Sequence, residues 1–277
     1  MKQEVNQLTT EDGHRIFFRS LVPGDPRAVL LLLHGLAEHS GYFEGTIDAL
    51  AAEGVAVFAP DHRGHGYSSG LPGDLQGLGL LLEDAALVQS EARKSVSQAP
   101  LFVFGHSYGG QLALLYTLRH QQELRGLVLS APLVLVPSYI SPVTVRVSLL
   151  LSRLVPRLPV QGFAYRRASR DPKVIEQLEN DPLYYKGKIR ARTGAIMLEG
   201  MEEASRRMAE LRLPLLVLHG EKDEIVELDC SRAVIERASS NDKTLKLYPE
   251  AMHHLVLEPE GEEILRLIAA WILERAA

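Results

Sequence analysis

The chain has 277 residues, 46% of them hydrophobic, which is enough to bury a large core without disulfides or a partner. Acidic and basic residues are mixed along the chain and give a net charge of −5, so no basic block is available for a phosphate backbone and we expect no nucleic-acid partner. The single cysteine, Cys230, has no disulfide partner within the chain, which favours a cytoplasmic location.

The N-terminal segment carries Glu4, Glu11 and Asp12 and no apolar stretch, so we expect no signal peptide. The longest apolar runs, such as AVLLLL at 28–33, are far shorter than the roughly 18 residues that a membrane-spanning helix needs. We therefore expect a soluble protein.

Short apolar runs without alternation recur along the chain, and such runs are typical of parallel strands that are covered on both faces. They lie at 28–35, 55–60, 101–105, 126–132, 214–220 and 244–248. Segments with helical spacing of apolar residues lie between or after them, at 46–53, 83–97, 109–121, 229–239 and 260–275. Two further β-like runs, 3–9 and 15–21, flank Asp12-Gly13 and predict a hairpin at the sheet edge. The alternation predicts an α/β fold.

From about 134 to 200 this alternation breaks: prolines mix with an apolar helical stretch, and a charged segment with DPLYY at 181–185 follows. We expect a cap over the active site at 134–200, inserted into a core formed by 1–133 and 201–277, because long insertions in compact domains tend to be functional. An ordinary crossover helix with irregular flanks is the alternative. The apolar stretch 143–155 suits acyl-chain entry or transient membrane contact, or equally packing on the core.

The sequence GHSYGG at 105–110 follows the apolar run LFVFG and leads into a helix-forming stretch. G-x-S-x-G alone is a weak signal, but strand, sharp turn and helix is the arrangement that exposes a serine hydroxyl at the edge of a sheet. Gly110 and Ala113 would let that helix pack closely. We therefore predict Ser107 as a nucleophile.

A serine hydroxyl needs a base to accept its proton, and the base needs an acid to orient it. Asp223 lies in a polar loop after the strand 214–219, although position alone fits Glu221 and Glu224 as well. The next strand ends before His253-His254, and from the residues alone either histidine suits the base. The chain order Ser, Asp, His is the order of α/β-hydrolases.

His34-Gly35-Leu36 ends the first core strand, and the backbone N–H of Leu36 together with that of Tyr108 would form an oxyanion hole. A plain strand-ending turn is the alternative. The histidines of DHRGHG at 61–66 and the pair at 253–254 lack a typical metal-binding pattern, so we expect no metal and no cofactor, and a structural role for the loop DHRGHG. Nothing around Cys230 indicates a reactive thiol.

Several motifs together resemble the monoacylglycerol lipase and lysophospholipase group of α/β-hydrolases, also described as serine aminopeptidase S33-like. They are HGLAEHSGYF, DHRGHGYSSG, GHSYGG, DPLYYKGKIRARTG, LHGEKDEIV and PEAMHHLVLEPE, and they extend from about residue 30 to 260. The resemblance implies a sheet of eight mostly parallel strands with helices on both faces, and it places the catalytic histidine at His253. It also suggests that Glu38 supports the alcohol side of the substrate pocket, with a structural role as the alternative.

The resemblance implies a serine carboxylic ester hydrolase that acts through an acyl-enzyme on a small ester or lipid. Among such enzymes it favours a monoacylglycerol lipase or lysophospholipase. A small-ester carboxylesterase, an amidase or peptidase, and a non-catalytic ligand-binding protein remain alternatives. The chain departs from the family pattern at Ala37, Tyr108, His254 and Leu257, where Gly, Met, Glu and Asn are common. Tyr108 changes the shape and polarity of the acyl site, so these departures bear on substrate choice and leave the catalytic set intact.

Overall fold

A computed structural model describes residues 2–138, 140–162 and 164–277. Tyr139 and Phe163, which fall within the predicted cap, lie outside the described residues. Eight strands form one sheet in the order β1-β2-β4-β3-β5-β6-β9-β10, in which β2 is antiparallel to both neighbours and the other pairs are parallel. The predicted sheet and its edge hairpin are confirmed. The strands are β1 (Glu4–Thr9), β2 (Arg15–Leu21), β3 (Ala28–Leu33), β4 (Val55–Pro60), β5 (Leu101–His106), β6 (Gly126–Ser130), β9 (Leu215–Gly220) and β10 (Lys243–Tyr248).

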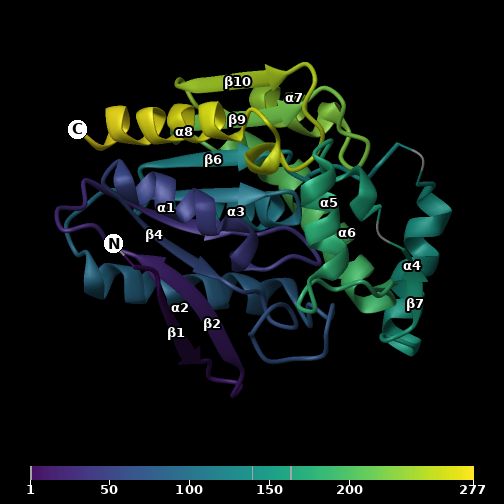
Figure 1. Ribbon diagram of the computed structural model, residues 1–277. Helices are drawn as coiled ribbons and strands as arrows, with labels where there is room; N and C mark the ends of the chain where they lie inside the picture. The colour runs from purple at the N-terminus through teal and green to yellow at the C-terminus, as the bar shows by residue number, and fades with distance from the viewer. Residues whose placement is uncertain (1, 139, 163) are drawn as a thin grey trace.

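Alternate side chains of the central strands enter two separate cores, as a strand period of two requires. In β3, Val29 and Leu31 contribute to one core, and Leu30 and Leu32 to the other. The helices α2 (Leu78–Ser95), α3 (Tyr108–His120) and α7 (Leu228–Arg237) cover the first face, whereas α1 (Glu44–Ala52) and α8 (Gly261–Ala276) cover the second (Figure 1). Helices therefore lie on both faces, as predicted.

Between β6 and β9 the chain leaves the sheet and forms an inserted segment. Its elements are α4 (Pro142–Leu154), β7 (Pro159–Gln161), η2 (Tyr165–Arg167), α5 (Pro172–Asn180), β8 (Ile189–Arg190), α6 (Ala191–Arg207) and η3 (Met208–Glu210). The strands β7 and β8 pair with each other. Figure 1 shows α4 and β7 at the end of the molecule farthest from the chain termini, with α5 and α6 between them and the sheet. Helix α6 crosses the predicted boundary at residue 200.

The loops after β3, β5, β9 and β10 all leave the sheet at the carboxyl ends of parallel strands, the edge where ligand sites of open α/β sheets form. These loops carry Leu36, Ser107, Asp223 and His253, so the topology gathers the predicted site residues on one edge. Two short helices, η1 (Ser40–Phe43) and η4 (Leu255–Leu257), follow the first and last of these loops. Within the described ranges, no helix has the length and apolar character needed to cross a membrane.

Candidate active site

Ser107 lies on the sharp turn between β5 and α3, with φ of 55° and ψ of −119°. A positive φ is uncommon for a residue with a side chain and persists only where the surroundings enforce it. Here the N–H of Ser107 donates to the carbonyl oxygen of Ser130 at 2.9 Å. A Cβ on Gly105 would collide with the carbonyl oxygen of Gly109, and a Cβ on Gly109 with that of Leu33. Both glycines of G-x-S-x-G are therefore required by close packing.

Asp223 lies in the loop between β9 and α7, and its side chain is 1% exposed. Its Oδ1 accepts hydrogen bonds from the backbone N–H groups two and three residues further along, at 2.8 and 2.9 Å. Its Oδ2 lies 2.7 Å from Nδ1 of His253. Glu221 and Glu224, the other acids of this loop, are exposed. Asp223 is therefore the acid of this loop that is bonded to His253.

The two groups shift each other's pKa in opposite directions. Burial alone would raise the pKa of Asp223, but the charge and hydrogen bond of His253, with a further hydrogen bond from His219, hold it well below its usual value. Burial would lower the pKa of His253, but the charge and hydrogen bond of Asp223 and the charge of Glu38 raise it instead. With Nδ1–H donated to an ionised Asp223, Nε2 of His253 is the ring atom that accepts a proton.

The adjacent histidine, His254, contacts Glu38. Its Nε2 lies 3.3 Å from Oε1 of Glu38, and its ring packs against Phe43 and His106 with centroid distances of 5.2 and 4.3 Å. Of the two histidines that the sequence leaves as alternatives, it is therefore His253 that contacts Asp223.

The loop after β3 carries Leu36, and two hydrogen bonds hold this loop in place. His34 Nε2 accepts the backbone N–H of His62 at 2.9 Å, and Glu38 Oε2 accepts the backbone N–H of Gly35 at 3.0 Å. Among the residues that the structure describes, the backbone N–H groups of Leu36 and Tyr108 have no hydrogen-bond acceptor. Tyr108 is also the first residue of α3, where the helix dipole favours negative charge.

Segment 181–185 contacts the same loop, an arrangement that sequence reasoning missed. Asp181 Oδ2 accepts hydrogen bonds from Nε2–H of His39 at 2.8 Å and from the hydroxyl of Tyr42 at 2.6 Å. The N–H of Tyr185 donates to the carbonyl oxygen of Ala37 at 2.9 Å. The motif DPLYY was visible in the sequence, but nothing local in it indicates a partner some 140 residues earlier.

The histidines of DHRGHG make contacts of a structural kind. Nε2–H of His62 donates to the carbonyl oxygen of His34 at 2.9 Å, and Nδ1 of His65 lies 3.2 Å from the carbonyl oxygen of Arg63. Within the described ranges, the group of side chains that could hold a metal ion is instead Glu38, His106 and His254. Sequence spacing could not reveal this group, because its members lie far apart in the chain, in two loops and at the end of β5.

A cavity of about 440 Å³ joins these features, which is within the usual range of about 300–1,000 Å³ for ligand pockets. Ser107 and His253 line it together with Leu36, Glu38 and Tyr108. The inserted segment contributes apolar and aromatic side chains, which include Tyr165, Tyr184, Ile189, Met197 and Met201. Ser107 and His253 therefore line a cavity whose wall is mostly apolar.

A family model described as serine aminopeptidase, S33 matches residues 24–260. The chain belongs to this family. It is 36% identical over 262 residues to a monoacylglycerol lipase of Mycolicibacterium smegmatis, with 94% of each chain covered. It is 29% identical to the monoglyceride lipase of Homo sapiens, over 99% of this chain and 92% of that protein. The crystal structure of a monoacylglycerol lipase from Paleococcus ferrophilus superimposes with a TM-score of 0.83 at 27% identity, covering 94% of this chain and 99% of that chain.

These comparisons confirm the resemblance seen in the motifs, the α/β-hydrolase fold and the prediction of a carboxylic ester hydrolase. In this S33 hydrolase, Tyr108 is fully buried in the core at the cavity wall. Tyr108 therefore contributes bulk to the cavity wall, and its hydroxyl makes no hydrogen bond to the described residues.

Proposed function

We propose that this S33 hydrolase cleaves monoacylglycerols through an acyl-enzyme on Ser107, with His253 as general base and Asp223 as the orienting acid. The observation that carries the proposal is the shared cavity: Ser107 and His253 line one mostly apolar space, and Nδ1 of His253 lies 2.7 Å from Asp223. The names of its relatives support the substrate class.

In the first step, Oγ of Ser107 attacks the ester carbonyl carbon while its proton passes to Nε2 of His253. The carbonyl oxygen becomes an oxyanion, which the backbone N–H groups of Leu36 and Tyr108 bind. Loss of one such donor typically lowers the rate by about 10²- to 10³-fold. The tetrahedral intermediate then breaks its bond to the glycerol oxygen, which leaves as an alcohol with the proton from His253.

In the second step, water attacks the acyl-enzyme and gives its proton to His253. The new intermediate releases the fatty acid and returns the proton to Oγ of Ser107. Asp223 stays ionised throughout and stabilises the imidazolium of His253, in accordance with the directions in which their pKa values are shifted. This chemistry calls for no cofactor.

We also assign residues 134–200 as a cap over the site, with 1–133 and 201–277 as the hydrolase core. Side chains of this segment form much of the cavity wall, which supports the assignment. The outer helix α4 exposes Val143, Leu150 and Leu154 by 66, 58 and 69%. Arg146 and Arg153 on the same helix are also exposed. An apolar and basic surface of this kind suits transient contact with an anionic membrane, where each basic residue contributes about 1 kcal/mol.

The membrane contact is tested by sedimentation with vesicles of anionic or zwitterionic phospholipid. We expect binding to the anionic vesicles that weakens in Leu150→Asp and Leu154→Asp. Val5→Asp is the control, because Val5 is 58% exposed on the edge strand β1, outside the cap. Equal binding by wild type and both cap variants would remove the membrane contact from the proposal.

The substrate is tested by hydrolysis of 4-nitrophenyl esters from acetate to palmitate, 1-monoacylglycerols and a lysophospholipid. Each methylene that enters the apolar cavity contributes about 0.8 kcal/mol, so kcat/KM should rise by up to about fourfold per methylene until the cavity is filled. We expect turnover of monoacylglycerol that Ser107→Ala abolishes. Ser148→Ala is the matched control, because Ser148 lines the same cavity away from the turn.

Activity confined to acetate would favour a small-ester carboxylesterase, and faster turnover of the lysophospholipid would favour a lysophospholipase. Amide substrates added to the series test the amidase or peptidase alternative. Absence of any serine-dependent turnover would favour a ligand-binding protein.

A further inference from the structure

Glu38 is a buried carboxylate that the two-step mechanism does not use. It lies in the loop between β3 and η1, and its side chain is 8% exposed. Oε2 accepts the backbone N–H of Gly35 at 3.0 Å and so closes the turn that contains Leu36. A buried charge is costly unless it is paired, so the second oxygen, Oε1, needs a partner as well.

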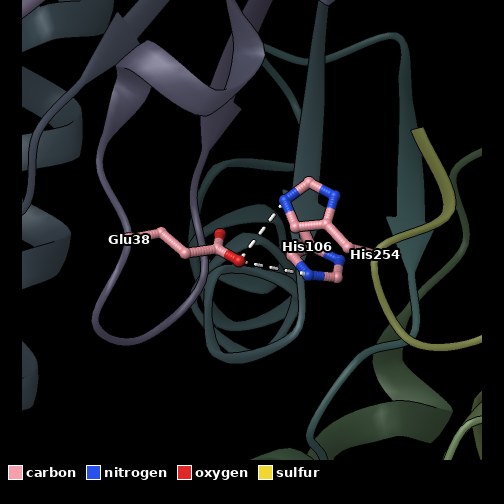
Figure 2. A group of neighbouring side chains, drawn as sticks. All are labelled: Glu38, His106 and His254. Atoms are coloured by element: carbon pink, nitrogen blue, oxygen red, sulfur yellow. Dashed lines mark ion pairs between the residues drawn. The ribbon is translucent and has the colours of Figure 1, made fainter. Parts of the chain in front are cut away.

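The second oxygen faces two imidazoles (Figure 2). Oε1 lies 3.3 Å from Nε2 of His254 and 3.8 Å from Nε2 of His106, and both imidazole side chains are 1% exposed. His106 ends β5 directly before Ser107, and His254 directly follows His253. Glu38 thus contacts the turn that carries the serine and the loop that carries the base, and it belongs to the loop that carries Leu36.

The charge of Glu38 also acts on His253. Burial alone would raise the pKa of Glu38, but the imidazoles of His254 and His106 lower it to about 2. Glu38 is therefore ionised at neutral pH, and its charge contributes to the raised pKa of His253. His253 is influenced by two carboxylates, one bonded at Nδ1 and one at longer range.

We propose that Glu38 is a positioning residue for ester hydrolysis and that His254 is its partner: their contact fixes the loop of Leu36 against the loop of His253. The proposal rests on the function assigned above to Ser107 and His253. The oxyanion donor and the general base come from distant parts of the chain, and the 3.3 Å contact between Oε1 of Glu38 and Nε2 of His254 links their loops. This contact therefore sets the distance between the N–H of Leu36 and the ring of His253, and the ester carbonyl must bind between them.

Titratable groups surround Glu38 on every side. They are Tyr42 in η1, His62 and His65 after β4, His106 at the end of β5, Tyr184 in the inserted segment, and His253 and His254 after β10. Burial lowers the pKa values of His62, His65 and His106 and raises those of the two tyrosines, so these five groups stay neutral near pH 7. The pH dependence near neutrality is therefore expected to come from His253.

The first variant is Glu38→Gln, which keeps the shape of the side chain and an oxygen for the N–H of Gly35 but removes the charge. We expect kcat to fall by about 10- to 100-fold, because small misplacements of reacting groups cost rates of this size. The KM should change little. The acid limb of the kcat/KM profile should move to lower pH, since His253 loses a charge that favours its protonated form.

Two variants of His254 test the contact with Glu38 while Glu38 itself is kept. His254→Gln keeps an N–H for Glu38 and should remain close to wild type, whereas His254→Leu leaves Oε1 without a donor and should lower kcat as Glu38→Gln does. Because His254 does most to lower the pKa of Glu38, the acid limb is compared between wild type and Glu38→Gln, and the His254 variants are compared by kcat. Far-UV circular dichroism and thermal unfolding establish that each variant is folded. If Glu38→Gln does not fold, the His254 pair carries the test.

The kinetics are measured on 4-nitrophenyl acetate and on a monoacylglycerol, with Ser107→Ala as the reference. If the wild type does not hydrolyse the monoacylglycerol, the proposed substrate is wrong, and the rates on 4-nitrophenyl acetate still test the role of Glu38. An unchanged kcat and acid limb in Glu38→Gln would overturn the positioning role, and a change confined to KM would make Glu38 a substrate contact instead. Loss of wild-type activity in EDTA, restored by Zn²⁺, would make the three side chains of Figure 2 a metal site and also overturn the proposal.

Discussion

The backbone N–H of Tyr185 donates a 2.9 Å hydrogen bond to the carbonyl oxygen of Ala37, which joins the inserted segment to the loop that carries Leu36. Ala37 has φ of 72°, a conformation that costs free energy for a residue with a Cβ. Asp181 adds two more contacts to this loop through His39 and Tyr42. A movement of segment 181–185 would therefore displace the N–H of Leu36.

Asp181→Ala tests this connection. It removes the acceptor of two hydrogen bonds, and bonds to charged groups are worth about 1.5–3 kcal/mol each. We expect kcat to fall at least tenfold, with a smaller change in KM, as measured by steady-state hydrolysis of a monoacylglycerol. Glu179→Ala is the control, because Glu179 pairs with the exposed Arg166 and does not contact the loop. Equal kcat values in the two variants would refute the connection.

Asp223→Asn tests which acid orients the base. The amide carries no charge, and its NH2 group can donate to Nδ1 of His253 and hold the ring in the wrong tautomer; loss of the orienting acid in this way typically lowers kcat by about 10⁴-fold. Glu224→Gln removes a neighbouring exposed carboxylate and should leave kcat close to that of the wild type. Rates for both variants are measured at saturating substrate. A large loss of kcat in Glu224→Gln, without one in Asp223→Asn, would show that Asp223 is not the orienting acid.

The pH dependence of activity follows from His253. As a base it acts when neutral, so kcat/KM is fully present above its pKa and is lost as the pH falls through it. The charge and hydrogen bond of Asp223 raise this pKa above the ordinary value of 6.5, so the midpoint of the acid limb should lie above pH 6.5. Initial rates between pH 4 and pH 9 on an uncharged ester give the midpoint. A midpoint below that of free histidine would contradict the account.

Arg63 tests the structural role of the loop DHRGHG. Its guanidinium is 1% exposed and makes two hydrogen bonds of 2.7 Å to Asp84. Removal of one partner from a buried ion pair costs about 3–5 kcal/mol of unfolding free energy, which is the loss expected for Arg63→Met in urea. The kcat of the folded enzyme should be retained. Arg166→Met, at a 74% exposed side chain, should leave the stability close to that of the wild type.

Elements of the sheet were the easiest part to predict, because buried parallel strands are uniformly apolar. The run 55–60 coincides with β4. The predicted and observed bounds differ where apolar and polar residues do not alternate, or where the backbone turns. Helix α2 begins at Leu78 instead of 83, since LGLLL has no polar residue to mark a helical face. Strand β6 ends at Ser130 instead of 132, since Ala131 adopts φ of 46°.

Contacts between distant loops could not be read from the sequence. Neighbouring residues such as His253 and His254 have the same chemistry, and the packing of their loop decides which ring contacts Asp223 and which contacts Glu38. The same applies to Asp181, whose partners lie in another part of the chain. Motif spacing gave the candidate residues, but their pairing depends on tertiary structure.

The most direct test of the central claim is to trap the acyl-enzyme. Enzyme mixed with a monoacylglycerol and quenched in acid within the first turnovers is analysed by intact mass and peptide mapping. We predict a gain of one acyl group on the peptide that contains Ser107, and neither this adduct nor turnover in Ser107→Ala. An acyl group on another residue, or undiminished hydrolysis by Ser107→Ala, would contradict the account.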